Sequence, residues 1–328
     1  SNEQLNNELI WSDYTFSASY LSGFRSMKDG EHYTASERNK KTKTVDIIKY
    51  SFQNRLENRA VLIPAEKLTH KGMYIYAQKY FFNSSETKAL IATNINSIYR
   101  RSFTATYFIY DIKKETLYPL SNEHQNQRLA EFSPDGSKVA FVSENNLYIK
   151  DIESNKTINI TKDGAMNEII NGATDWVYEE EFSITKGFYW SDKGTKIAYY
   201  KFNETDVKEF TMKYYGNLYP TLYNFKYPKA GEDNSKLSLH IYELKKKKST
   251  EVDLDETLCG GDTLVINNQQ YFTPGVYNIY MENSYGCDSI INLDLTVVTI
   301  NNHVTTSGTV LTAADPNADA YQWVDCNN

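Results

Sequence analysis

The sequence predicts an all-β protein in which blades of a β-propeller precede a small antiparallel β-sandwich-like module. Three observations lead to this prediction: a strand-rich composition, two motifs that recur in the same order, and a step in charge near residue 250. The composition is 14% aromatic, with 27 Tyr but only 7 Pro. Aromatic and β-branched residues are enriched in strands, so this composition favours sheets over helices.

The first recurring motif joins two strands through a tight turn. A strand that ends on an aromatic residue is followed by a turn in which Asp or Lys precedes Gly. A second strand then follows, in which apolar residues alternate with others. It occurs at residues 132–141 and 190–199, and more weakly at 26–33. Turns of this composition close β-hairpins.

The second motif is an apolar strand that ends on an acidic and then an aliphatic residue. It occurs at residues 107–112, 147–152 and 239–244. Strand–turn–strand units that recur at about 40–60 residues are typical of propeller blades. An all-β protein with ordinary hairpins would share the turns, but it would not require two motifs to alternate in one order.

The charge of the chain changes sharply near residue 250. All 35 Lys and Arg precede residue 249, whereas 11 of the 42 Asp and Glu follow residue 248. Such a step indicates two parts with different histories. We expect a partial propeller over residues 1–250, a small acidic β-repeat module over 251–298, and the start of a further β-module over 299–328.

The acidic module shows the alternation expected of strands with one apolar face. Apolar and polar residues alternate over residues 276–281 and again over 291–297. This pattern predicts three or four antiparallel strands.

All three Cys lie in the acidic part, at positions 259, 287 and 326. Their spacing does not fit a zinc site. Cys259 and Cys287 could close a loop as a disulfide, which would fit an exported protein. Cys326 is then left over, and we expect its partner further along the chain.

The composition argues against two classes of partner. No run approaches the length of about 18 apolar residues that a membrane span needs. No basic patch with interleaved aromatic residues is large enough for nucleic-acid binding. The five His show no metal-binding or catalytic context, and we expect no metal and no cofactor.

Residues 175–181, Asp-Trp-Val-Tyr-Glu-Glu-Glu, are the most informative segment of the chain. Three consecutive carboxylates repel one another, so a purely structural site rarely concentrates them. Two carboxylates that converge on one point bind a small ammonium group, such as the free amino terminus of a peptide, which is mostly charged at neutral pH. An exposed acidic helix start, favoured by the helix dipole, is the alternative interpretation.

With its flanking residues 171–174 and 182–183, this run resembles the double-glutamate motif of dipeptidyl peptidase IV. That family consists of serine exopeptidases in which an eight-bladed β-propeller precedes an α/β-hydrolase domain. Residues 99–107 and 227–231 resemble two further family segments, in family order. The resemblance covers about residues 8–248, so it implies about half of the eight-bladed ring.

The resemblance also implies roles for individual residues. The second and third glutamates of the family triplet, here Glu180 and Glu181, hold the amino terminus of the substrate. The family arginine that lies beside them and contacts the substrate backbone corresponds to Arg100. Tyr178 and Ser183 are candidates for lining the same cavity.

The two glutamates need a particular backbone to serve one ligand. Neighbouring side chains of a strand point to opposite faces, whereas a helical turn separates them by about 100°. We therefore expect residues 178–182 to form a short helix or an irregular insertion within a blade. Glu179 is then the glutamate that faces elsewhere.

A cation beside two carboxylates offsets their mutual repulsion. A guanidinium can bridge a carboxylate and a peptide carbonyl because its donors form a planar fork. Arg100 falls on the family position and Arg101 is adjacent, so alignment alone separates the two.

The catalytic half of the family does not occur in the 328 residues. The family nucleophile lies on a G-x-S-x-G turn, followed by Asp and His, and no such motif is present. Without a nucleophile, a base and an oxyanion hole there is no route to acyl transfer. We expect the chain alone to bind peptides with a free amino terminus, but not to release the Xaa-Pro or Xaa-Ala dipeptides that the family releases.

A half ring leaves the faces of its terminal blades open, which favours self-association. The family resemblance predicts export to the periplasm or cell surface. Residues 251–298 resemble repeats of secreted Bacteroidetes adhesin-like proteins, so a non-enzymatic adhesin-like surface protein is the alternative function. The junction near residue 250 would then mark a fusion, a rearrangement or an assembly error.

Overall fold

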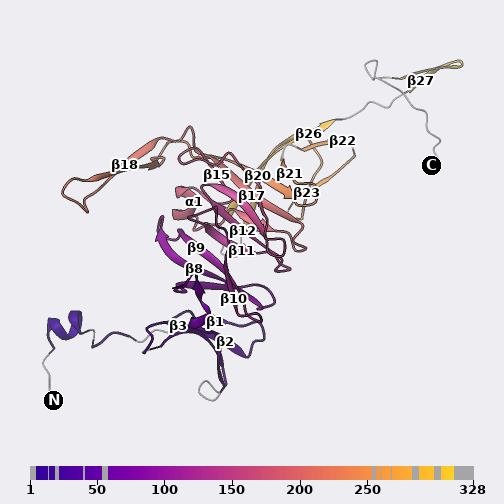
Figure 1. Ribbon diagram of the computed structural model, residues 1–328. Coiled ribbons are helices and arrows are strands. Elements are labelled where there is room, and N and C mark those ends of the chain that lie inside the picture. Colours follow the sequence, from indigo (N-terminus) through magenta and orange to yellow (C-terminus); the bar gives the residue numbers. More distant parts are fainter. Residues whose placement is uncertain are drawn as a thin grey trace. The chain divides into compact units, whose positions relative to one another are not determined.

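The computed structural model describes residues 5–13, 15–18, 22–39, 41–53, 58–252, 256–259, 261–266, 268–282, 288–298 and 304–313. The chain divides into two compact units, residues 1–251 and 252–328. Most regular elements in these ranges are β-strands (Figure 1), and none of the helices there is long and apolar enough to cross a membrane.

The first unit contains four larger antiparallel sheets, of four or five strands each, that follow one another along the chain (Figure 1). The first sheet consists of β1 (Arg25–Ser26), β2 (His32–Arg38), β3 (Val45–Ser51) and β4 (Arg59–Ile63), paired in that order. The π-helical turn η1 (Glu8–Ser12) precedes it. After this sheet come the 3-10 turn η2 (Ala65–Lys67) and a short hairpin of β5 (Thr69–His70) and β6 (Met73–Tyr74).

The second and third sheets are also meanders of four strands in chain order. The second consists of β7 (Lys79–Phe82), β8 (Lys88–Ser97), β9 (Phe103–Asp111) and β10 (Thr116–Pro119). The third consists of β11 (Arg128–Phe132), β12 (Lys138–Ser143), β13 (Asn146–Asp151) and β14 (Thr157–Asn159).

The fourth sheet carries two insertions. Its strands are β15 (Ile169–Asn171), β16 (Phe188–Trp190), β17 (Lys196–Asn203), β20 (Lys236–Glu243) and β21 (Lys248–Glu251), and both β15 and β16 pair with β17. Helix α1 (Trp176–Glu180) lies between β15 and β16. A hairpin of β18 (Glu209–Tyr214) and β19 (Thr221–Lys226) lies between β17 and β20 and projects away from the sheets (Figure 1).

The recurring sequence motifs form the hairpins that the sequence predicts. The first motif turns from β11 into β12 and from β16 into β17, and its glycines, Gly136 and Gly194, have φ of +68° and +63°. That region of backbone conformation favours glycine. The second motif lies in β9, β13 and β20, the strands that continue each blade.

The apolar core lies between successive sheets. In β12, Val139 and Phe141 belong to the cluster shared with the second sheet, whereas Ala140 and Val142 belong to the cluster shared with the fourth. Because side chains alternate along a strand, one strand contacts both neighbouring sheets. This face-to-face packing of consecutive four-stranded meanders is that of propeller blades, so the all-β, partial-propeller prediction is confirmed.

The second unit contains smaller sheets. Its strands are β22 (Glu256–Cys259), β23 (Leu264–Ile266), β24 (Gln269–Tyr271), β25 (Gly275–Glu282), β26 (Asp288–Val298), β27 (Val304–Ser307) and β28 (Val310–Ala313). One sheet has the order β22-β26-β25, and the β23–β24 and β27–β28 hairpins form two-stranded sheets of their own.

The predicted alternation in the second unit produces one buried face. Leu293 and Leu295 are buried with Tyr271 and Ile279. The pairing differs from a wholly antiparallel module, because β22 and β26 run parallel while β25 and β26 are antiparallel. Three strands lie between β22 and β26 in the sequence, and a connection of that length is long enough for the crossover that parallel strands need.

Candidate functional site at helix α1

Helix α1 is a single short helix held at its start by Asp175. Asp175 Oδ1 accepts the backbone N–H of Tyr178 at 2.9 Å, and Oδ2 accepts the Ser235 hydroxyl. A side-chain acceptor at this position satisfies an amide that the helix itself leaves unpaired. Trp176 packs beside Tyr227, with ring centroids 4.5 Å apart. The Asp that opens the acidic run is therefore structural.

Two glycines allow the chain to approach itself on either side of α1. Gly172 has φ of +73°, and a Cβ on Gly187 would lie 2.8 Å from the carbonyl oxygen of Ala173. The Gly187 N–H donates to Gly172 O at 3.1 Å. These contacts join the two ends of the insertion, so the segment that carries α1 leaves the blade and returns to it at nearly the same place.

The first glutamate of the triplet, Glu179, is completely buried. Its Oε1 accepts the backbone N–H groups of Arg101 and Ser102, each at 2.8 Å. The Arg101 guanidinium donates through Nη1 to the Glu179 carbonyl at 3.1 Å. Glu179 thus binds the turn between β8 and β9, a segment of another blade.

The second glutamate, Glu180, lies beside two arginines. Its Oε2 is 3.7 Å from Arg100 Nε and 4.0 Å from Arg101 Nη1, and its Oε1 accepts the Arg100 backbone N–H at 3.4 Å. The Glu180 side chain is 15% exposed and that of Arg100 is 73% exposed. The carboxylate is therefore partly desolvated, while the guanidinium of Arg100 is open to a ligand.

The third glutamate, Glu181, is exposed at the C-terminal end of α1, where its N–H donates to Val177 O at 2.9 Å. Ser183 is also exposed and has φ of +59°. Tyr178 is half-buried and packs against Phe202 rather than standing free.

The structure brings together two of the residues that the sequence singles out, Glu180 and Arg100. Glu181 and Ser183 follow α1 in the same insertion and are exposed. The binding roles of all these residues stay predictions. Sequence reasoning assigned no role to Glu179, and left Arg101 as an alternative to Arg100, although both arginines lie within 4.0 Å of Glu180.

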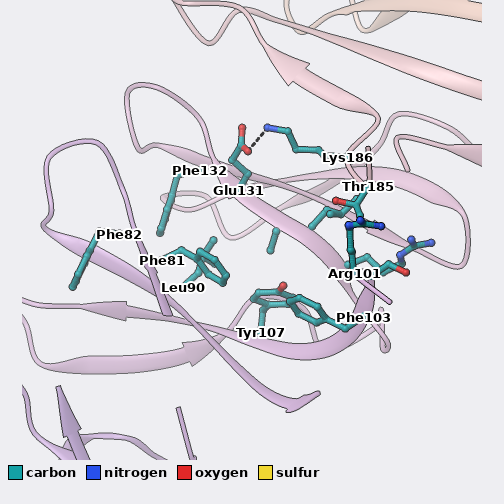
Figure 2. Close-up of a pocket in the computed structure, with 14 residues that line it drawn as sticks. Phe81, Phe82, Leu90, Arg101, Phe103, Tyr107, Glu131, Phe132, Thr185 and Lys186 are labelled. Atoms are coloured by element: carbon teal, nitrogen blue, oxygen red, sulfur yellow. Dashed lines mark hydrogen bonds and ion pairs between the residues drawn. The ribbon is translucent and has the colours of Figure 1, made fainter. Parts of the chain in front are cut away.

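A cavity of about 410 Å³ lies next to this site, between the second and third sheets (Figure 2). Aromatic side chains, Phe81, Phe103 and Tyr107 among them, form much of its wall. Arg101 lies at one end of the cavity and Phe82 at the other (Figure 2). No pattern in the sequence predicted this cavity, because its lining comes from strands that are far apart in the chain.

Three buried or partly buried ionisable groups interact with residues of this site. Burial lowers the pKa of the Arg128 guanidinium, and the charge of Glu179 acts in the opposite direction. Burial raises the pKa of the Tyr99 hydroxyl. Burial raises the pKa of Glu204 to about 7; the charge of Asp175 adds to this rise and Lys226 opposes it.

Two further predictions concern parts outside this site. Cys259 ends β22, whereas Cys287 lies outside the described residues, so the predicted disulfide stays a prediction. Among the residues that the structure describes, no group of three or more His, Cys, Asp or Glu side chains could hold a metal ion.

Four stacked antiparallel sheets, with a short acidic helix inserted in the fourth, define the class of this protein: a partial β-propeller that carries an acidic site beside paired arginines. The family model for the dipeptidyl peptidase IV (DPP IV) N-terminal region matches residues 83–277, more than half of the chain. The chain belongs to this family.

Individual relatives agree with the family match. A probable dipeptidyl-aminopeptidase B of Podospora anserina is 36% identical over 193 residues, which is 54% of this chain and 21% of that protein. A probable dipeptidyl-aminopeptidase B of Tuber melanosporum is 34% identical over 252 residues, 70% of this chain and 28% of that protein. The chain therefore spans only about a quarter of the length of these relatives.

A solved structure also matches. The crystal structure of Porphyromonas gingivalis dipeptidyl peptidase 4 is 36% identical in sequence, with a TM-score of 0.69, and the match covers 77% of this chain and 35% of that one. The family match ends at residue 277, beyond the division between the compact units at residue 251. The resemblance of residues 251–298 to adhesin-like repeats stays a prediction.

Proposed function

We propose that this chain supplies the substrate-recognition part of a dipeptidyl peptidase IV-like serine exopeptidase, in which Glu180 and Glu181 bind the free amino terminus of a peptide. One observation carries the proposal: the Glu180 carboxylate lies 3.7 Å from Arg100 Nε and 4.0 Å from Arg101 Nη1, and its side chain is 15% exposed. The family membership of the chain supports it.

The chemistry of the site suits a peptide end. A substrate ammonium group carries three N–H donors and would lie against the carboxylates, with charge-assisted hydrogen bonds. Glu181 follows Glu180 by about 100° around the helix, and its exposed side chain can turn toward the same ligand. Arg100 is 73% exposed, so its remaining donors can reach a backbone carbonyl of the same peptide.

Binding and hydrolysis would belong to different parts of such an enzyme. The relatives are named as dipeptidyl-aminopeptidases, and the chain covers 21–28% of the two described above. The printed sequence has no G-x-S-x-G turn for a nucleophile. The part of the protein in this sequence would therefore select peptides by their amino terminus without cleaving them.

Isothermal titration calorimetry tests the proposal. The dipeptide Ala-Pro and its N-acetylated form differ at the amino terminus alone, because acetylation removes the charge and two donors. We expect the 328-residue chain to bind Ala-Pro at least about tenfold more tightly than acetyl-Ala-Pro, since one charged hydrogen bond contributes roughly 1.5–3 kcal/mol. Equal heats for the two peptides would refute the amine site.

We further propose that the protein acts outside the cytoplasm, at the periplasm or cell surface, as the resemblance to exported peptidases and the Cys259–Cys287 pair suggest. Fractionation of the source cells, with an antibody against residues 83–252, tests this. Recovery of the protein in the cytosolic fraction alone would contradict it.

A further inference from the structure

Glu179 lies where three blades meet. It belongs to α1, an insertion in the fourth sheet, and its side chain crosses to the turn between β8 and β9 of the second sheet. Arg128, the first residue of β11 in the third sheet, is buried nearby and interacts with Glu179 through its charge. The Glu179 carboxylate thus links α1 to a turn that is 77–78 residues away in the chain.

Glu179 holds the main chain of this turn through hydrogen bonds, and we call this set of hydrogen bonds the clamp. One oxygen, Oε1, accepts two consecutive N–H groups, those of Arg101 and Ser102, at 2.8 Å each. Hydrogen bonds to an ionised carboxylate are about twice as strong as neutral ones. The same turn carries Arg100, whose own N–H donates to Glu180 Oε1 at 3.4 Å. Two neighbouring glutamates therefore hold three successive amides.

The clamp is buried, so its charge needs a counter-charge. Glu179 is 0% exposed and Arg128 is 8% exposed. The Nε and Nη2 atoms of Arg128 and the Oε2 atom of Glu179 are buried and make no hydrogen bond to any residue that the structure describes. Burial lowers the pKa of Arg128, while the charge of Glu179 raises it. Leaving one of two buried charges without the other would cost several kcal/mol.

We infer that Glu179 is a positioning residue for the amine site: it fixes the turn of residues 100–102 so that Arg100 and Arg101 face Glu180. This role rests on the proposed function only for its effect on peptide binding, since the clamp itself is a property of the fold. The geometry of the site then depends on the docking of three blades rather than on α1 alone.

Hydrogen exchange tests the clamp directly. In Glu179→Gln the acceptor is neutral, so the backbone amides of Arg101 and Ser102 are expected to exchange at least about tenfold faster, as measured by NMR on the full chain. Glu153→Gln, the same change at an exposed turn of the third sheet, is the matched control and is expected to leave both rates unchanged. Protection of the β12 amides shows that the variant is folded.

Unchanged exchange at both amides in folded Glu179→Gln would overturn the inference. Should that variant fail to fold, the double variant Glu179→Gln, Arg128→Met removes both buried charges together, which is far less costly than leaving one unpaired. Faster exchange at Arg101 and Ser102 is again expected, and wild-type rates there would overturn the role of Glu179.

Peptide binding separates this inference from the proposed function. If the wild-type chain distinguishes Ala-Pro from acetyl-Ala-Pro, Glu179→Gln is expected to reduce that ratio severalfold, while Glu153→Gln keeps it. A wild-type chain that does not distinguish the peptides refutes the amine site, yet the exchange rates still decide whether Glu179 clamps the turn. A variant with faster exchange and an unchanged binding ratio would show that the clamp does not position the arginines for binding.

Discussion

At the scale of single residues, three adjacent glutamates have three different surroundings. Glu179 is buried, Glu180 is 15% exposed beside two arginines, and Glu181 faces solvent. The cause is the helical backbone of α1, which turns by about 100° from one residue to the next. A strand would have placed Glu179 and Glu181 on one face and Glu180 on the other.

We expect Glu180 and Glu181 to contribute unequally to peptide binding. Glu180→Gln is expected to weaken binding of Ala-Pro by about tenfold or more, because Glu180 is the less solvated carboxylate. Glu181→Gln should have a smaller effect, because its exposed charge is screened by water. Calorimetric titration of both variants measures this, and a Glu180→Gln variant that binds like the wild type would contradict it.

At the scale of residues, the sequence predicted features that depend on neighbouring residues, but not the contacts between residues that are far apart in the chain. The acidic triplet led us to expect a short helix or irregular insertion over residues 178–182, and α1 covers Trp176–Glu180, two residues earlier, with Glu181 directly after its end. The burial of Glu179 depends on amides of Arg101 and Ser102, 78 and 77 residues away. The sequence predicted that Glu179 faces elsewhere than its two neighbours, but not that it binds these two amides.

At the scale of elements, the insertion that carries α1 depends on close backbone contact. A Cβ at residue 187 would lie 2.8 Å from Ala173 O and 3.0 Å from Ala173 N. We expect Gly187→Ala to lower the free energy of unfolding by about 1–3 kcal/mol, because neither backbone can retreat without breaking strand pairing.

Urea unfolding measures that cost. Gly216→Ala is the matched control, because nothing lies within 4 Å of a Cβ at that position. It is expected to change stability by less than about 0.5 kcal/mol. Equal stability of the two variants would show that the approach of the chain at Gly187 is not tight.

The segment after β17 carries a pH-sensitive group. The folded protein keeps the proton of Glu204 up to a pKa of about 7, whereas the usual value is 4.5, chiefly because the side chain is buried. Between these pH values the unfolded chain binds fewer protons than the folded one, so the free energy of unfolding falls as pH rises. The full effect is up to about 3 kcal/mol.

Unfolding in urea at a series of pH values from 4.5 to 8 measures the contribution of Glu204. Glu204→Gln removes the titration, so its stability should fall less steeply over this range than that of the wild type. Parallel profiles for the two proteins would show that Glu204 does not titrate in this window.

The strands and turns that carry the recurring motifs were predictable from the sequence. Turns with glycine at positive φ, such as Gly136 and Gly194, mark where β11 and β16 end. The parallel pairing of β22 with β26 was not predictable, because period-two alternation is the same for either strand direction. The hairpin β18–β19 was also missed, since its strands pair only with each other and are mostly exposed.

At the scale of the whole molecule, the stacked sheets follow from recurring motifs, and the all-β class was readable from the sequence. In the first unit, the first three blade sheets are meanders in which each strand pairs with a sequence neighbour, and in the fourth sheet β15, β16 and β20 all pair with β17. Alternation along β12 predicts that Val139 and Ala140 face opposite sides, but not which sheet each one contacts: Val139 packs with the second sheet and Ala140 with the fourth.

The 328-residue chain is expected not to hydrolyse peptides. No G-x-S-x-G motif is present to supply a nucleophile. In an assay with a chromogenic Gly-Pro substrate, product release should stay at the rate of the buffer control. Turnover that rises in proportion to protein concentration, and that Glu180→Gln abolishes, would contradict this expectation.

The β18–β19 hairpin leaves the fourth blade from between two strands that pair directly with each other. β17 and β20 pair without interruption from Lys196↔Glu243 to Asn203↔Lys236. The hydrogen bonds of the sheet therefore do not depend on this hairpin, which we call the arm. Closing a flexible loop twice as long costs only about 0.6 kcal/mol more. The tip of the arm, residues 215–220, is therefore a place where mutation can add, remove or exchange whole stretches of chain at little cost, and where a reporter peptide could be grafted without disturbing the blade.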